Sequence, residues 1–433
     1  MALAGAAALA ASSGAAQQEG GVTAGLTLTP GIHYEDKRFS PWLGFGAEVQ
    51  TQTRTQSLAL SFNTALDGSD LFSGLSDSLR DPRLNLSYSL ENRNTALEAT
   101  LSYRRSKISQ LFLAEVLDEE FLILDEGQRA DLNSTAALTF GREAPFGGVL
   151  DLRYGQRRYS GISDPRLRNE DSRAAGLSLR FDIDRRIRMT LAARISETDV
   201  AGDGTDQRRE SLSLGAELAA SPTLTTSLRI GTSRITETTG GVAQVRDGVT
   251  WGVSAEQEMP NGVLSGQIDS DLTAAGRLRT ARLDRSMDLP RGTLRYGVGI
   301  TQQPGGKLTP IASLGWQYTT RAANFQLSYD RSLRVARAGE SGIDDRLGLS
   351  WQQEIDSLSQ LGLDVTLRRT ERLDAGERDS QQASLSLNWQ RDLTQDWVLR
   401  SSYTHRWTRD AGSRDTRDNI VFLGLERRFQ WRP

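Results

Sequence analysis

Apolar residues recur at every second position in many short segments of the chain. Leu177, Leu179 and Phe181 alternate with polar residues in one segment, and Leu385 and Leu387 do so in another. A period of two is typical of a β-strand with one apolar and one polar face. The pattern predicts about 22 strands, and most are near the ~11 residues that a tilted strand needs to cross a bilayer.

The predicted connections between these strands alternate in length. Short turns are expected at 91–94, 184–186, 221–222, 259–261, 289–291 and 393–395. Longer connections are expected at 67–81, 107–128, 159–172, 199–207, 237–246, 334–343, 372–379 and 409–416. Short periplasmic turns that alternate with longer outside loops are the pattern of an outer-membrane barrel. A soluble propeller or sandwich has no reason to show it.

We therefore predict an all-β protein that folds as a closed antiparallel transmembrane β-barrel of about 22 strands, with about 18 or 20 as alternatives. The barrel must close because lipid offers no partner to the backbone groups of an open edge. The barrel is expected to comprise residues 22–433, preceded by a short periplasmic N-terminus at 17–21. Because so few residues precede the first strand, we expect no plug domain.

Residues 1–16 read MALAGAAALAASSGAA, an apolar run that resembles the hydrophobic region and cleavage site of a signal peptide. The basic segment that usually precedes such a run is missing, since the first lysine is Lys37. We attribute this to a start codon assigned slightly late; a disordered alanine-rich tail is the alternative. Export fits the rest of the chain, and we expect it in the outer membrane of a Gram-negative bacterium.

Composition excludes several other classes of protein. The 433 residues include no cysteine and only two histidines, His33 and His405, which rules out thiolate and histidine-rich metal sites. The net charge of −3 provides no broad positive field for nucleic acid. We expect no cofactor, no metal and no enzymatic activity. A lipid-modifying barrel enzyme with His405 as its base is a less favoured alternative, because His405 is in phase with Tyr403 at the expected lipid interface.

Charged residues on the polar face of the predicted strands are candidates for the wall of a pore. Arginine suits this role because its guanidinium stays charged and pairs bidentately with carboxylates or sugar acids. Columns of arginine and carboxylate across a wet lumen select solutes by charge; the alternative is that they only hydrate the interior. Arg285 instead falls in the apolar phase, which indicates a bulge, a subunit contact or an error in the predicted register. The predicted pore-lining residues are Arg153, Arg180, Arg229, Arg295, Arg368, Arg400, Arg406, Glu98, Asp151, Asp182, Glu217 and Asp364.

Aromatic residues gather near the ends of the predicted strands, where their rings suit the headgroup level of a membrane; ordinary β-propensity is the alternative. The alternating last strand ends with Phe429 and resembles the C-terminal signal read by the barrel assembly machinery, although a short extension to Pro433 follows it. The closing segments Trp389–Thr394, with Trp397, and Phe422–Leu425 resemble those of barrel porins linked to exopolysaccharide export.

The resemblance to outer-membrane porins implies passage of a solute or polysaccharide, and we expect a channel. A non-transporting structural or adhesion barrel is the alternative. The expected partners are outer-membrane lipid and lipopolysaccharide, the barrel assembly machinery, and a periplasmic or polysaccharide-export partner that fills the lumen. No nucleic acid is expected.

Connection 107–128 differs from the other predicted loops, because it combines many large apolar residues with six acids and partly helical spacing. It follows the fifth predicted strand, and in general porins the constriction loop folds into the lumen from that same connection. By this resemblance we expect it to narrow the pore, with a cap or subunit contact outside the barrel as the alternative. Its acids are Glu115, Asp118, Glu119, Glu120, Asp125 and Glu126.

Overall fold

The computed structural model describes residues 21–35, 38–68, 79–108, 127–164, 167–202, 204–335, 341–373, 379–410 and 415–431. Within these residues the chain forms 22 β-strands. The strands are β1 (Gly21–Glu35), β2 (Arg38–Gln52), β3 (Gln56–Asp67), β4 (Leu79–Glu91), β5 (Thr95–Lys107), β6 (Gln128–Phe140), β7 (Phe146–Ser160), β8 (Glu170–Asp182), β9 (Ile187–Val200), β10 (Thr205–Ala219), β11 (Leu224–Thr239), β12 (Val242–Met259), β13 (Gly262–Thr273), β14 (Gly276–Leu289), β15 (Gly292–Gln302), β16 (Leu308–Thr319), β17 (Ala323–Val335), β18 (Ser341–Glu354), β19 (Ser359–Arg372), β20 (Ser380–Asp392), β21 (Trp397–Asp410) and β22 (Thr416–Trp431). The predicted signal peptide at 1–16 lies outside the described residues.

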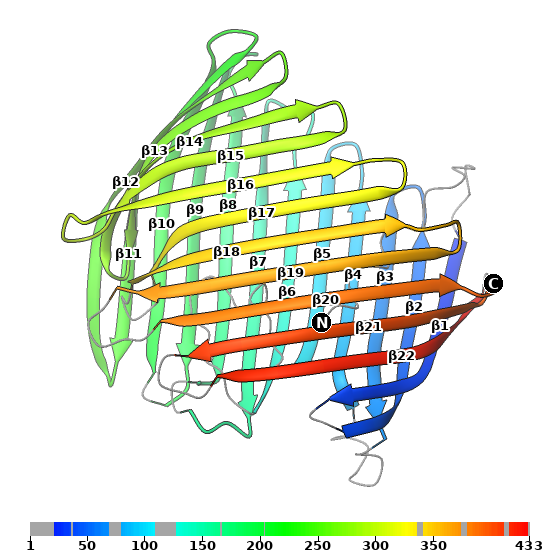
Figure 1. Cartoon of the computed structure of the whole chain (residues 1–433). Coiled ribbons are helices and arrows are strands. Elements are labelled where there is room, and N and C mark those ends of the chain that lie inside the picture. Colours follow the sequence, from blue (N-terminus) through cyan, green and yellow to red (C-terminus); the bar gives the residue numbers. More distant parts are fainter. Residues whose placement is uncertain are drawn as a thin grey trace.

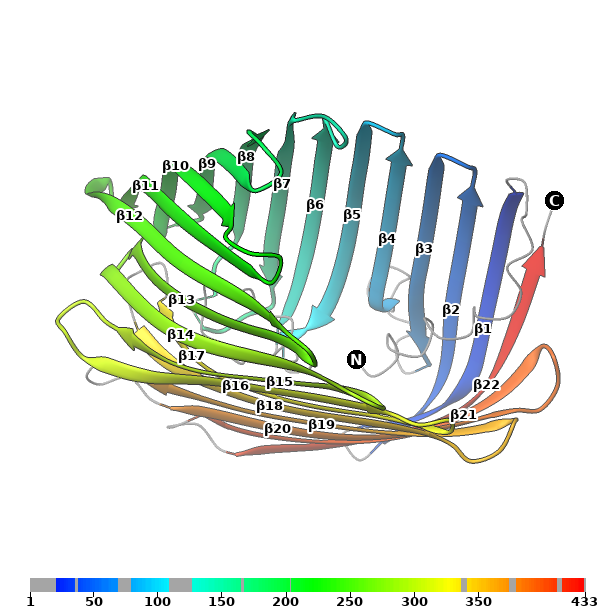
Figure 2. The same cartoon turned by 90° about the horizontal axis from the view of Figure 1, so that it is seen from above.

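The strands pair antiparallel in chain order, and β22 returns to pair with β1, so that the sheet closes into a barrel (Figure 1). Leu26 lies opposite Phe429 across this seam. The observed number of 22 strands excludes the alternatives of 18 and 20. Figure 2 shows an arc from β1 to β12 and a sharp turn of the wall between β12 and β13. Arg209 on β10 spans this turn, since its Nη2 donates to the carbonyl oxygen of Leu272 on β13 at 3.0 Å.

The alternation sorts the side chains into an outer and an inner face. Leu177, Leu212 and Ile230 are 40%, 52% and 54% exposed on the outside of the barrel, where lipid replaces water as their neighbour. The residues between them are polar or small and face the lumen. The apolar side chains of such a chain contact lipid, so the fold does not require a hydrophobic core. Among the described residues, no helix is long and apolar enough to span a membrane.

Several turns at the short-turn end repeat one hydrogen-bond pattern. The side-chain oxygen of a Ser, Thr or Asp near the start of the turn accepts backbone N–H groups two or three residues further along. In the β8–β9 turn, Asp184 accepts from the backbone of Arg186 at 2.6 Å and of Ile187 at 2.8 Å. These donors stabilise the ionised carboxyl and hold the pKa of Asp184 below its usual value. The residues that accept in this way are Thr53, Asp184, Ser221, Thr320, Asp356 and Thr394.

At the opposite end of the barrel, some predicted loops are wrong. The range 237–246 belongs mainly to β11 and β12, which are joined by Gly240 and Gly241 with φ values of 58° and 79°. Glycine adopts positive φ readily, as a two-residue hairpin turn requires. Ser341, expected in a loop, begins β18 and is 9% exposed. The physical reason is that strands continue to pair beyond the bilayer, where apolar alternation is no longer needed.

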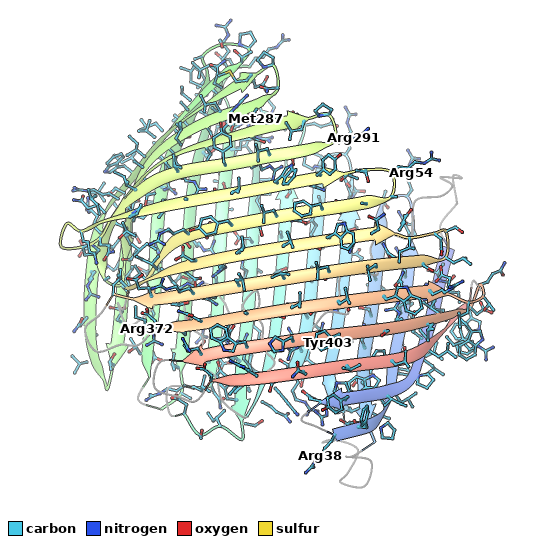
Figure 3. All side chains as sticks on the ribbon, viewed as in Figure 1. Arg38, Arg54, Met287, Arg291, Arg372 and Tyr403 are labelled. Carbon is cyan, nitrogen blue, oxygen red and sulfur yellow. The ribbon has the colours of Figure 1, made fainter. Side chains whose placement is uncertain are left out.

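Figure 3 separates the two ends of the barrel. Arg54 and Arg291 lie at the end with the short turns, whereas Arg38 and Arg372 lie at the other end. The first residue of β1 and the last residue of β22 share the short-turn end, because Ala24 pairs with Trp431. Since short turns face the periplasm in bacterial barrels, we assign this end to the periplasm and the other end to the cell exterior.

Candidate functional site

The candidate site is the inner wall of the barrel. Arg180 and Asp182 alternate with Leu179 and Phe181, and Phe181 is 40% exposed on the outer face. The same phase holds for the other predicted pore-lining residues, so all of them lie at inward positions. These others are Arg153, Arg229, Arg295, Arg368, Arg400, Arg406, Glu98, Asp151, Glu217 and Asp364. Their role in transport stays a prediction.

A ladder of charges crosses β8, β9 and β10 near the periplasmic end. Arg180 Nε lies 3.2 Å from Asp182, and Arg188 Nε lies 2.7 Å from the other oxygen of Asp182. Arg188 Nη1 also reaches Glu217 at 3.6 Å. Sequence reasoning missed Arg188, although its alternation with the outward Met189 and Leu191 carried the necessary signal. The ladder fixes two arginines and two carboxylates at one level of the wall.

A second charged group lies beside the closing seam. The carboxylate of Glu426 on β22 accepts from Arg400 Nη2 at 3.1 Å and from Arg428 Nε at 2.7 Å. Glu426 is 5% exposed, so this pairing satisfies a buried carboxylate. On the far side of the barrel, Arg229 Nη2 lies 3.4 Å from Asp271. Glu426 and Asp271 were absent from the sequence prediction because cross-strand pairing is not visible in one strand.

The most buried charge described lies on the inner face near the extracellular end. The Asp344 carboxylate on β18 is fully buried and accepts from Arg334 at 3.0 Å, Arg346 at 2.8 Å and Arg368 at 2.5 Å. The Thr370 hydroxyl donates to it at 2.9 Å. A buried carboxylate is tolerated only with such partners. We call these five residues the Asp344 cluster; of them, only Arg368 was predicted.

A similar cluster joins β6, β7 and β8 at the same end. Asp131 accepts from Arg129 Nε at 2.7 Å and lies 3.3 Å from Arg157 Nε, and Arg157 Nη1 reaches Glu170 at 3.4 Å. Arg157 is 3% exposed. Because guanidinium groups fork, one arginine can tie two strands together. We call these four residues the Asp131 cluster, and none of them was predicted.

The predicted residues therefore divide by exposure. Arg368 and Arg406 are buried, at 5% and 9% exposed, and contribute to the structure of the wall. Glu98, Arg295 and Asp364 are exposed on the lumen face and can touch a solute. The six acids of the predicted constriction, Glu115, Asp118, Glu119, Glu120, Asp125 and Glu126, lie outside the described residues. The described residues contain no group of acids and histidines that could hold a metal ion.

Outward-facing charges begin where the apolar band ends, and they are paired. Arg173 Nη2 lies 2.6 Å from Asp199 and its Nε lies 3.3 Å from Glu197. Arg331 contacts both oxygens of Asp345 at 2.9 and 3.0 Å. Charges on the lipid face are costly at the bilayer midplane but cheap near the interface. These pairs therefore mark the outer edge of the membrane.

Two residues whose roles the sequence analysis left undecided, Arg285 and His405, lie on the outer face. Arg285 lies on the lipid side, and its Nη2 donates to the Asn261 side chain in a periplasmic turn at 2.5 Å, so it snorkels to the interface. His405 faces outward, and its Nδ1 lies 2.9 Å from the side-chain oxygen of Asn419. The same oxygen accepts from the hydroxyl of Tyr403, which is labelled in Figure 3. Neither residue therefore reaches the lumen.

Phe429, predicted as the assembly-signal aromatic, lies on the outer face of β22. Its ring stacks on that of Trp431 with centroids 6.2 Å apart. The Arg427 guanidinium lies over Phe429 at 4.6 Å and over Trp397 at 5.1 Å. These rings sit at the periplasmic end of the last hairpin, where an aromatic girdle is expected. Recognition by the assembly machinery stays a prediction.

Comparison with known proteins places the fold. No protein-family model and no curated protein match the sequence. The siderophore receptor PirA from Acinetobacter baumannii matches with a TM-score of 0.56 and 8% identity, over 96% of this chain and 81% of that chain. The ferric-catecholate import receptor Fiu from E. coli K12 matches with a TM-score of 0.61 and 8% identity, over 95% of this chain and 82% of that chain. The FrpB iron transporter from Neisseria meningitidis matches with a TM-score of 0.58 and 9% identity, over 94% of this chain and 82% of that chain.

At such low identity the similarity concerns the fold, which is that of an outer-membrane barrel. The predicted location in the outer membrane of a Gram-negative bacterium is confirmed. These solved structures are receptors and an iron transporter rather than enzymes, in agreement with the prediction that the chain is not an enzyme.

The expectation of a barrel without a plug domain is corrected. Outer-membrane transporters with 22-stranded barrels have a plugged lumen, because a bore of that width must be filled. The match covers only 81% to 82% of the three solved chains, so each contains further residues beyond the matched part. The few residues before the first strand therefore do not argue against a plug. The chain is an outer-membrane β-barrel with the closed 22-strand architecture of this group of structures.

Proposed function

We propose that this protein passes a solute across the outer membrane through its polar lumen. The observation that carries the proposal is the ladder formed by Arg180, Asp182, Arg188 and Glu217, which holds fixed charges of both signs on the inner wall. Fixed charges on the wall of a pore select solutes by charge. Glu98, Arg295 and Asp364 add exposed charges to the same face.

Ion selectivity in planar bilayers tests this proposal. Purified protein should conduct, and Glu217→Lys should shift the reversal potential in a salt gradient toward anions. Asp171→Asn is the matched control, because Asp171 faces outward and pairs with Arg158 at 2.7 Å. If Glu217→Lys conducts with the same ion selectivity as the wild type, the ladder does not line the transport pathway.

We also propose that segment 107–128 narrows the lumen. Its apolar residues need cover, and its six acids would find partners among lumenal arginines. Deletion of residues 110–125 should leave the barrel assembled, raise its conductance and sensitise cells to bulky antibiotics. Unchanged conductance and exclusion in an assembled deletion variant would make the segment a cap or a contact surface.

Two classes of solute are compatible with this proposal. A polysaccharide is supported by the resemblance of the closing hairpins to barrel porins linked to exopolysaccharide export. A ferric siderophore complex is supported by the names of PirA and Fiu, which share the fold. Uptake of labelled compounds into proteoliposomes separates the two.

A non-transporting structural barrel is the second candidate. It is favoured by the Asp344 and Asp131 clusters, which tie several strands together at the extracellular end. A rigid rim suits an adhesion or anchoring surface as well as it suits a pore. A purified, folded barrel that neither conducts nor admits solutes into liposomes would favour this candidate.

A further inference from the structure

Aromatic side chains of the described strands face the membrane almost without exception. Three lie at inward positions: Trp42 on β2, Tyr159 on β7 and Phe422 on β22. Tyr159 packs against the buried Ile108 and Leu167, so it belongs to the wall. Trp42 and Phe422 instead form an aromatic pair, and the charged pathway does not account for them.

The aromatic pair is built on glycines at the seam where β22 closes onto β1. Trp42 lies opposite Gly31, and Gly31 lies opposite Gly424, so three strands contribute to one row. The Phe422 ring covers both glycines, because a Cβ at Gly31 would lie 2.9 Å from it and a Cβ at Gly424 would lie 2.5 Å from it. The Trp42 and Phe422 ring centroids are 6.4 Å apart at 71°.

His33 extends this pair along the wall. Its ring centroid lies 5.1 Å from that of Trp42. Phe422 is 9% exposed and forms the floor, whereas Trp42 and His33 are half-buried and present ring surface to the lumen. We call His33, Trp42 and Phe422 the lumen aromatic cluster.

Charged groups of both signs lie beside the lumen aromatic cluster. Arg80 lies 3.0 Å from Asp67 and 3.9 Å from Glu35. These three groups, together with Lys107, are the charges that act on His33. Among the described residues, the charges that act on His33 are therefore two acids and two cations. Such mixed charges give no excess of positive charge that would attract an anion.

We propose that the lumen aromatic cluster is a stacking site for an uncharged sugar ring, so that the solute of this barrel is a saccharide. This inference rests on the proposed transport function and names its substrate class. A pyranose ring has one flat apolar face that an indole can cover, and hydroxyls at its edge that suit polar lumen groups. An entirely apolar solute would not enter this lumen, and a simple anion would gain nothing from the ring faces.

A structural alternative is that the rings only stabilise the glycine-rich seam, as aromatic side chains do when they cover strand glycines. The two readings differ at Trp42. If the cluster is only structural, loss of the indole lowers barrel stability and leaves sugar binding untouched. If the cluster is a binding site, the half-buried indole can be lost from an assembled barrel with a loss of sugar affinity.

Calorimetric titration of the purified full chain in detergent with maltohexaose tests the inference. Binding in detergent does not require the pore to conduct, so it separates the failure of this inference from the failure of the transport proposal. We expect the wild type to bind, Trp42→Ala to bind at least about tenfold more weakly, and Trp42→Phe to retain most of the affinity. Trp389→Ala, on the outer face, is the matched control and should bind like the wild type.

Assembly of each variant is checked by its heat-modifiable mobility on gels. Equal maltohexaose affinity in wild type and assembled Trp42→Ala overturns the inference, and so does the absence of binding to the wild type. Binding of a ferric catecholate in place of maltohexaose, with the same dependence on Trp42, overturns the saccharide assignment. If Trp42→Ala fails to assemble, Trp42→Gln, which keeps a side chain of intermediate size, takes its place.

Discussion

The Phe422 ring on β22 occupies the space that a side chain at Gly31 on β1 would need, since a Cβ there would lie 2.9 Å from the ring. These two residues are almost 400 positions apart, yet they meet where the barrel closes. The contact joins the first strand to the last, and the ring is 9% exposed. The absence of a side chain at Gly31 therefore leaves room for this ring at the closing seam.

The first prediction concerns this seam. Gly31→Val should destabilise the closed barrel by about 1–3 kcal/mol, because the new side chain overpacks against Phe422 and the Leu423 carbonyl. The midpoint of unfolding in guanidinium chloride measures the effect. Gly215→Ala is the control, because the nearest atoms to a Cβ there are 3.7 Å away or more. If both variants lose the same amount of stability, the contact at the seam is not the cause of the loss.

The second prediction concerns the two faces of the wall. Leu179→Arg should impair assembly, since arginine on the lipid face costs about 2–4 kcal/mol at the midplane. Ser178→Arg should assemble, because Ser178 itself points into the wet lumen, whereas its sequence neighbour Leu179 faces lipid. Heat-modifiable mobility on gels distinguishes folded from unfolded protein. Equal assembly of both variants would contradict the assignment of Leu179 to the lipid face and Ser178 to the lumen face.

The third prediction concerns orientation in the membrane. A cysteine at Ser163 should react with an impermeant maleimide on whole cells, because Ser163 is exposed between β7 and β8. A cysteine at Ser221, in a short turn, should not react. The chain has no native cysteine, so the background is low. Ser341 is not a suitable reporter, since it is 9% exposed within β18. The reverse labelling pattern would invert the topology.

The fourth prediction concerns the Asp344 cluster. Asp344→Asn should lower stability by about 3–5 kcal/mol, because it removes the charge that buried arginines pair with. Asp364→Asn on β19 provides the control, since Asp364 is an exposed inward acid. Unfolding midpoints of the two variants give the comparison. A loss no larger for Asp344→Asn than for Asp364→Asn would show that the buried pairing is not stabilising.

The fifth prediction concerns pH and the short turns. The pKa of Asp184 lies below its ordinary 3.8, because backbone N–H groups of Arg186 and Ile187 bond the ionised form. A lowered folded-state pKa means that the carboxylate stabilises the barrel above the unfolded-state value. That contribution is lost as the pH falls through the folded-state pKa.

Asp184→Ala should therefore destabilise the barrel at neutral pH, and the difference from wild type should shrink below about pH 4. Ser221→Ala is the control, because Ser221 makes the same kind of turn with a hydroxyl that does not titrate. Its effect should stay constant over the same range. A constant difference for Asp184→Ala as well would exclude the carboxylate charge as the cause.

The sequence by itself determined which residues face lipid and which face the lumen. A period of two assigns each side chain to a face without any knowledge of neighbouring strands, and Leu179 and Ser178 follow that rule. The same alternation identified Arg180, Asp182 and Glu217 as inward residues. The alternation stops being informative above the membrane, which is why it predicts a loop at 237–246 although β11 and β12 continue through that range.

The exclusion of a plug domain was wrong for a related reason. It rested on counting residues before the first strand, which says nothing about how wide the bore is or what fills it.

Only the tertiary structure decided which charges pair and where the rings gather. Asp344 draws its arginines from three strands, and the hydrogen-bond register that brings Arg334 and Arg368 to it cannot be read from any one strand. The inward Trp42 looks like any other strand aromatic until β22 closes onto β1 and brings Phe422 beside it. Local alternation fixes the direction of a side chain, but its partners depend on closure of the sheet, which joins residues from opposite ends of the chain.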